Sequence, residues 1–147
     1  MMKTMSAQNY SNHVQRVPLF GITMLVLMLT AIGAIVNLVL SWGDHQRLYS
    51  ASLILVLSLC TVVVGGCARS FPLKAQDRAI RAEENLRHYV LTGKLLDARL
   101  TPLQIVALRF ASDPEFAELA KQAAEKSMKP DEIKRAVKNW RPDTYRV

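Results

Sequence analysis

Histidine and cysteine, the side chains that most often carry chemistry in proteins, are few in this sequence and widely separated. His13, His45 and His88 fall in three different regions of the chain. Cys60 and Cys67 are seven positions apart, about 10 Å along a helix. That distance is too long for a disulfide. These spacings favour neither a metal site nor a disulfide framework.

One pair of residues has the spacing of an acid–base or metal pair. Glu84 and His88 are four positions apart and share one face of a helix. A single pair of this kind is neither a di-metal site nor an acid and a base beside a nucleophile. No glycine-rich phosphate loop follows a strand. We therefore expect a protein that is not an enzyme, with no catalytic residue, metal, cofactor or small-molecule substrate.

Two apolar segments dominate the first half of the chain. Asp44 and Arg47 are the only residues of Asp, Glu, Lys or Arg type between positions 17 and 68. Segments 18–41 and 48–68 lack such charges, and the first would extend about 36 Å as a helix. Both lengths suffice to cross a bilayer. The sequence predicts a transmembrane hairpin over residues 17–68.

The residues around these segments predict their orientation. Trp42 and Tyr49 flank the connecting loop as interfacial aromatic residues do. The N-terminal tail carries Lys3 and Arg16, the loop only Arg47, and the stretch after the second segment several basic residues. These are Arg69, Lys74, Arg78, Arg81 and Arg87. Cytoplasmic loops are enriched in Lys and Arg. We expect residues 1–16 to form a cytoplasmic tail and residues 69–147 a cytoplasmic α-helical domain.

Small and polar residues predict where the two apolar helices touch. Membrane helices associate through close backbone approach and occasional hydrogen bonds. The predicted contact is formed by residues that recur along one side of each segment: Gly33, Asn37, Ser58, Thr61 and Gly65. Asn37 either joins the helices or lines a polar path, and a path needs several converging polar groups.

A charged helix follows the second apolar segment. Pro72 is expected to break or start a helix, residues 74–92 have helical periodicity, and Gly93 is a natural cap. Five residues recur at heptad-like spacing: Ala75, Ala79, Ala82, Leu86 and Tyr89. We call this set the apolar seam. It packs either on the rest of the tail or on a second copy or partner.

The charges around the apolar seam have two expected roles. Glu83–Arg87 and Glu84–His88 are pairs at i,i+4, each contributing about 0.2–0.5 kcal/mol when exposed. Three basic residues near the membrane are expected to contact lipid headgroups: Arg69, Lys74 and Arg78.

Three further helices have clear starts in the sequence. "TPLQ" predicts Thr101 as the N-cap with Gln104 closing a capping box, and "SDPE" predicts a start at Ser112 or Asp113. "KPDEIKRAVKNW" predicts a helix from Pro130. The tail is therefore expected to be a compact helical bundle. Its last helix is basic, but without interleaved stacking aromatics we expect no nucleic-acid binding.

Long stretches resemble a known family. They include "QNYSNHVQRVP", "ARSFPLKAQDRAIRAEENLRHYVLTGKLLD", "LRFASD" and "IKRAVKNWR". The chain is similar from about Gln8 onward to an uncharacterised family of small bacterial inner-membrane proteins with two spans and a domain of unknown function. The resemblance implies a bacterial cytoplasmic membrane but assigns no residue a role. The opening "MMKTMS" departs from the family pattern, so Met1, Met2 and Met5 are alternative starts.

The sequence thus predicts an all-α protein, a transmembrane hairpin followed by a small cytoplasmic helical domain with both termini cytoplasmic. The expected function is that of a membrane-anchored interaction module or accessory subunit. Its expected partners are membrane lipids and either itself or another membrane protein. The alternative is a homo-oligomeric pore or transport component lined by Thr30, Asn37 and Ser58.

Overall fold

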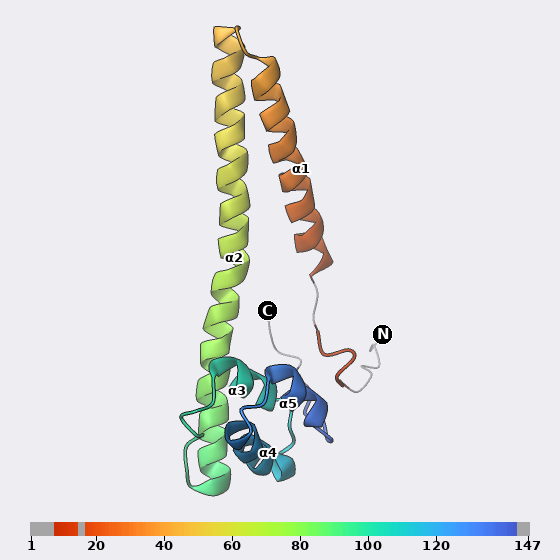
Figure 1. Cartoon of the computed structure of the whole chain (residues 1–147), viewed down its shortest axis with the longest axis vertical. Coiled ribbons are helices and arrows are strands. Elements are labelled where there is room, and N and C mark those ends of the chain that lie inside the picture. The colour runs from red at the N-terminus through yellow and green to blue at the C-terminus, as the bar shows by residue number, and fades with distance from the viewer. Residues whose placement is uncertain (1–7, 15–16, 144–147) are drawn as a thin grey trace, which may run out of the picture. The chain divides into compact units, whose positions relative to one another are not determined.

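The computed structural model describes residues 8–14 and 17–143 (Figure 1). The described part of the chain is all-helical, with five helices: α1 (Pro18–Leu40), α2 (His45–Thr92), α3 (Pro102–Leu108), α4 (Asp113–Glu125) and α5 (Pro130–Ala136). The described residues form two compact units, one of residues 17–71 and one of residues 8–14 with 72–143. Lys3, Arg16 and the alternative starts Met1, Met2 and Met5 lie outside the described residues.

The unit of residues 17–71 is a pair of helices joined by a short turn. Gly43 adopts a φ of +96°, a left-handed conformation that favours glycine. The Asp44 carboxylate then accepts hydrogen bonds of 3.2 Å from the backbone N–H groups of Gln46 and Arg47. This cap starts α2 at His45, three residues before the predicted second segment at Leu48. The turn between the helices is correspondingly shorter than expected.

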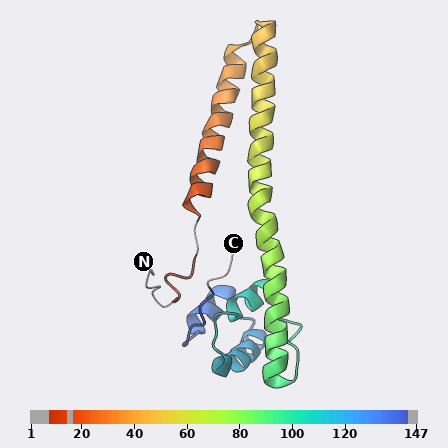
Figure 2. The ribbon, with the colours of Figure 1, turned by 180° about the vertical axis from the view of Figure 1, so that it is seen from behind.

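The helix α1 runs alongside the first half of α2 near the turn (Figure 2), and small residues line their contact. The buried residues recur at spacings of three and seven: Ala31 and Ala34 on α1 with Ser41 at its C-cap, and Ala51 and Ser58 on α2. We call these residues the hairpin packing line. Gly65 continues it, because a Cβ there would lie 2.8 Å from the Sδ atom of Met24. Small side chains at this spacing let two helices approach closely.

The helix α2 continues through Pro72, contrary to the predicted break. Proline lacks an N–H group, so the carbonyl of Ala68 loses its partner in the helix. The loss costs about 3 kcal/mol in a helix interior. The helix is 48 residues long and remains helical both before and after the proline. It ends at Thr92 as predicted, where Gly93 has a φ of +72° and donates to the carbonyl of Tyr89 at 2.8 Å.

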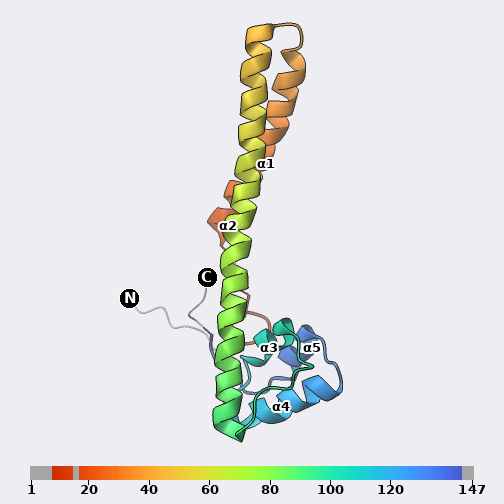
Figure 3. The ribbon, with the colours of Figure 1, turned by 90° about the vertical axis from the view of Figure 1, so that its left-hand side faces the viewer.

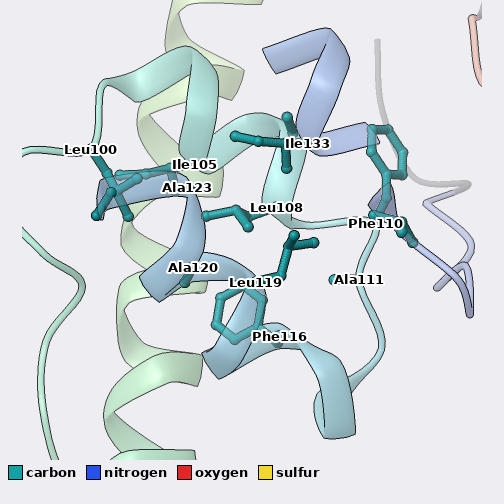
Figure 4. Packing of buried hydrophobic residues seen from close by; sticks show 13 residues of the cluster. Leu100, Ile105, Leu108, Phe110, Ala111, Phe116, Leu119, Ala120, Ala123 and Ile133 are labelled. Carbon is teal, nitrogen blue, oxygen red and sulfur yellow. The ribbon is translucent and has the colours of Figure 1, made fainter. Parts of the chain in front are cut away.

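The hydrophobic core of the second unit lies among α3, α4 and α5 (Figure 4). Its largest fully buried side chains are Phe110, Phe116, Leu108 and Ile133. The capping box of Thr101 and Gln104 starts α3 as predicted, and the Gln104 amide also donates to the carbonyl of Met128 at 2.7 Å. A local cap thereby also joins α3 to the turn before α5.

The helices α4 and α5 start where the sequence predicts, but α5 ends earlier than predicted. Ser112 is the N-cap of α4, and α5 begins at Pro130. The last helix ends at Ala136, where Val137 turns to an extended conformation; the chain bends at Lys138 and Asn139, and Trp140 is paired to Ala111 in an antiparallel bridge. The predicted helix through Trp140 is therefore too long. The core takes up Val137 from the segment after α5 instead.

The Glu115 carboxylate holds this segment. It closes the cap of α4 and accepts from the backbone N–H groups of Lys138 at 3.1 Å and Asn139 at 3.0 Å. Burial alone would raise the pKa of Glu115, but the hydrogen bonds from Lys138, Asn139 and Ser112 outweigh it and hold the pKa below its ordinary 4.5. One ionised carboxylate therefore organises both the start of α4 and the segment after α5.

Candidate interaction surface

The end of α2 has one face against the small helices and one face exposed (Figure 3). Ile80 and Glu84 are buried, and Asn85, Arg87 and His88 are partly buried. Residues 80, 84 and 87 recur on one side at spacings of four and three, the period of a helix face. The domain therefore packs on a mainly polar face of α2.

Arg87 is the centre of this packed face. Its guanidinium donates to Asp113 at 2.7 Å, to Glu84 at 2.9 Å and to the carbonyl of Ala111 at 2.8 Å. It also lies 4.3 Å from the ring centroid of Phe116, a cation–π contact. The predicted i,i+4 partner was Glu83, whereas the ion pair forms with Glu84 at i,i+3. A planar guanidinium with several fixed donors is needed to make all of these contacts.

Two further contacts fix the chain that leaves α2. The Asn85 side-chain oxygen accepts from the backbone N–H of Leu96 at 2.9 Å. The Nδ1 atom of His88 lies 2.7 Å from the carbonyl of Lys94, and its ring meets Phe116 edge-on at 5.9 Å. His88 thus contacts a backbone carbonyl and an aromatic ring. Glu84, the residue expected to pair with His88 at i,i+4, pairs instead with Arg87 and Arg141.

The apolar seam lies on the other side of the same helix. All five of its residues are exposed: Ala75, Ala79, Ala82, Leu86 and Tyr89. Leu86 is 63% exposed, Tyr89 54%, and the neighbouring Val90 75%. The first sequence alternative, packing of the apolar seam on the rest of the tail, therefore does not describe this structure. The domain uses the polar face and leaves the apolar one open.

A shallow cleft of about 360 Å³ adjoins the packed face. It is lined by charged residues, namely Glu83, Glu84, Arg87, Asp113 and Arg141. Glu84, the most buried of them, is paired with Arg87 at 2.9 Å and faces Arg141 at 3.7 Å. Within residues 8–14 and 17–143, no three residues of His, Cys, Asp or Glu type are grouped to hold a metal ion. The cleft is thus the surface of a structural ion-pair network.

The N-terminal tail packs against α5 in the same unit. The hydroxyl of Tyr10 donates to Asp131 at 2.7 Å, and the Arg135 guanidinium lies 4.9 Å from the Tyr10 ring centroid. The hydrogen bond from Tyr10, with the nearby Arg135 charge, holds the pKa of Asp131 below its ordinary 3.8. The Gln8 side-chain oxygen accepts from the backbone N–H of Asp143 at 2.7 Å. These contacts were not expected from the sequence.

His13 is the buried residue of this tail. Its ring lies 5.6 Å from that of Phe110 and 5.7 Å from that of Trp140. The Nδ1 atom lies 2.7 Å from the carbonyl of Tyr10, and the Nε2 atom lies 3.2 Å from the Lys134 ammonium. Both ring nitrogens of His13 therefore have polar neighbours within the same unit.

The residues predicted to form the contact between the two apolar helices differ in their exposure. Ser58 is buried and Gly65 is half-buried beside Met24, whereas Gly33, Asn37 and Thr61 are exposed. On α1 the buried residues are instead Ala31 and Ala34, which flank Gly33 in sequence and face a different side of the helix. Asn37 borders a depression of about 490 Å³ next to the turn. The hairpin packing line thus differs from the predicted contact mainly on α1.

The three basic residues predicted to meet lipid headgroups all lie on α2. Lys74 and Arg78 are exposed and Arg69 is half-buried. No ion pair within the described residues involves them, which leaves their charges toward solvent or another molecule.

The fold defines a class: an all-helical protein with two helices, α1 and α2, that are long and apolar enough to cross a membrane. Within that class the chain belongs to a Family of unknown function (DUF6526), whose profile matches residues 5–147. The resemblance seen in the sequence is thus confirmed at the level of a family of unknown function. Neither a search of curated proteins nor a search of solved structures finds a match.

Proposed function

We propose that this chain is an integral membrane protein without catalytic activity that presents the apolar seam of α2 to a protein partner. The observation that carries the proposal is the division of α2 into two faces. The face with Glu84 and Arg87 binds the small helical domain, and the face with Leu86 and Tyr89 is exposed. Contiguous exposed apolar residues on a folded protein are typical of an interaction site.

The surface of the hairpin supports membrane anchoring. Only 11% of the most apolar window of each long helix is buried. Leu, Ile and Val side chains therefore cover most of the outside, for example Leu29, Leu57 and Val63. Such a surface is unfavourable in water and favourable in lipid. Trp42 and Tyr49 lie near the turn, where an interfacial aromatic belt would place them.

The tail contacts support one topology. The hydrogen bonds of Tyr10 with Asp131 and of Gln8 with Asp143 support a position of the N-terminal tail and the helical domain on the same side of the membrane. Two crossings between them are consistent with this arrangement. The basic residues near both crossings favour the cytoplasm for this side. With the expected bacterial origin, we infer an inner-membrane protein with both termini in the cytoplasm.

Lipid headgroups are the proposed partners of the basic residues closest to the membrane. Arg69 directly follows the apolar segment, and Lys74 is exposed on the same helix. A basic residue near an anionic surface gains about 1 kcal/mol from the surface potential. These contacts would hold the start of the cytoplasmic part of α2 at the membrane.

The pore alternative has less support from side-chain geometry. The hydroxyl of Thr30 donates to the carbonyl of Val26 at 2.9 Å, and that of Ser58 donates to Ile54 at 2.8 Å. Ser58 belongs to the hairpin packing line and is buried, whereas Asn37 and Thr30 are exposed. A polar path needs converging groups. These three side chains do not converge within one chain.

A photo-crosslinking residue in the native membrane tests the interaction. Placed at Leu86, it should give a discrete protein adduct of the full chain. The matched control is Arg81, which is exposed on the same helix but outside the apolar seam. An adduct at Leu86 and none at Arg81 supports the proposal. Equal adducts at both positions, or none at Leu86, would sink it.

A further inference from the structure

We infer that the partner at the apolar seam is a second copy of this chain, with the two α2 helices parallel and in register. The inference rests on the proposed function and names its partner. Three features of α2 carry it: the positions of the packed residues around the helix, the charges that flank the apolar seam, and the orientation that a membrane imposes.

The heptad positions place the small domain outside such a dimer. In a parallel two-stranded coil the a and d residues meet the partner helix and the b, c and f residues face away. The apolar seam supplies a at Ala79 and Leu86, and d at Ala75, Ala82 and Tyr89. The packed face then falls mainly on the outer positions, with Ile80 and Arg87 at b, Glu84 at f and His88 at c. Asn85 at g accepts from the backbone N–H of Leu96, beside the apolar seam. A second copy can therefore cover the apolar seam without displacing α3, α4 or α5.

The flanking charges are complementary in the parallel arrangement. Arg78 occupies a g position and Glu83 the e position five residues later, and both are exposed. In a parallel coil the g residue of one helix meets this e residue of the other. Because the dimer is two-fold symmetric, the ion pair between Arg78 and Glu83 of the second copy forms twice. An antiparallel coil would instead pair e positions with e positions and g positions with g positions, so Arg78 and Glu83 would not meet.

Membrane anchoring favours the same arrangement. Copies with one topology present the apolar seam on the same side of one membrane, which favours a symmetric contact between identical surfaces. The alanines of the apolar seam bury little area each. Confinement in a membrane compensates, because it raises the effective concentration of one copy around another.

The position of Arg78 leaves it available for this pair. It lies ten residues beyond Ala68, the end of the predicted second segment, whereas Arg69 and Lys74 are nearer to that segment in the sequence. Arg78 is exposed and has no ion pair within the described residues, so it can pair with Glu83 of the second copy.

Cysteine crosslinking of the full chain in native membranes tests the parallel dimer. In a background with Cys60→Ala and Cys67→Ala, Ala82→Cys places one thiol on each side of the two-fold axis. Oxidation with copper–phenanthroline should give a disulfide-linked dimer. Arg81→Cys, one residue away at a c position, should give a several-fold lower yield. Adding Arg78→Glu to Ala82→Cys should lower the dimer yield, and adding Arg78→Glu with Glu83→Arg should restore it.

The outcomes separate this inference from the proposed function. Restoration by the reciprocal charge swap would support the Arg78–Glu83 pair and rule out simple misfolding. Equal yields at positions 81 and 82, or no dimer at 82, would overturn the parallel dimer. If the dimer is absent and a crosslinker at Leu86 still captures a different protein, the proposed function stands and only the self-association is wrong. If Leu86 captures no protein, both fail.

Discussion

Glu84 and Leu86 are two residues apart on α2, yet Glu84 is 5% exposed and Leu86 is 63% exposed. Two positions on an α-helix are about 200° apart, so the residues face opposite sides. The Glu84 carboxylate is buried against Arg87, whereas the Leu86 side chain packs on no part of the small domain that the structure describes. This inversion of the usual burial preference is the main evidence that the apolar seam meets another molecule.

Arg87→Met should strongly destabilise the helical domain. The substitution leaves the buried Glu84 carboxylate with only Arg141, at 3.7 Å, and removes the contacts to Asp113 and Ala111. Removing one partner of a buried ion pair costs about 3–5 kcal/mol. The free energy of unfolding can be followed in the full chain in detergent by Trp140 fluorescence, with Trp42→Phe as background. Arg81→Met is the control and should change it by less than about 0.5 kcal/mol. Equal effects of the two substitutions would contradict the role of Arg87.

Tyr10→Phe should raise the pKa of Asp131 toward its ordinary 3.8, because it removes the hydrogen bond that stabilises the carboxylate. Because the contact with Tyr10 lowers the pKa of Asp131, the ionised carboxylate stabilises this contact at pH values above the ordinary pKa. The stabilisation is lost as the pH falls through the lowered value. Attachment of the tail should therefore weaken on acidification below pH 3.8. An NMR titration of the Asp131 carboxyl in the full chain measures the shift, and identical titrations of both proteins would count against the contact.

The hairpin packing line can be tested by paired cysteines. With Cys60 and Cys67 replaced by alanine, Met24→Cys with Gly65→Cys should form an intramolecular disulfide on oxidation, since these residues are in contact. Met24→Cys with Thr61→Cys is the control, because Thr61 is exposed and lies about one helical turn before Gly65 along α2. Gel mobility before and after reduction reports the bond. Preferential bonding of the Thr61 pair would favour the contact predicted from the sequence instead.

The proposed topology predicts which thiols are reachable from outside the cell. In the same background, Trp42→Cys in the turn should react with a membrane-impermeant maleimide on intact spheroplasts. Ala98→Cys in the helical domain should react only after the membrane is opened. Both positions are exposed in the structure, so accessibility reports the side of the membrane. Labelling of Ala98→Cys on intact spheroplasts would reverse the topology.

The helix starts of the small domain were predictable because capping is local. Thr101 with Gln104, and Ser112 with Glu115, are three residues apart in sequence and make the contacts their residue types favour. Gly93 ends α2 for a similar local reason. Pro72 was misleading for a physical reason as well. A proline removes one hydrogen bond, and a long helix can continue past it.

The long-range contacts were beyond the reach of a single sequence. Tyr10 and Asp131 are 121 positions apart, and no local pattern joins them. The only local signal was the presence of Tyr10, His13 and Val14 among the polar residues of positions 8–16. The heptad spacing of the apolar seam was visible in the sequence. Its exposure was not, because that depends on which face of α2 the small domain occupies.

The most direct test of the account is the mass of the intact complex after gentle extraction of native membranes. The full chain with a C-terminal tag should purify as an assembly heavier than one 16.5 kDa chain. Ala82→Glu places a charge in the middle of the apolar seam and should reduce the assembly to a single chain. Ala98→Glu, exposed and outside the apolar seam, should leave it intact. A wild-type protein that purifies as a single chain, or an assembly that Ala82→Glu leaves unchanged, would contradict the interaction at the apolar seam.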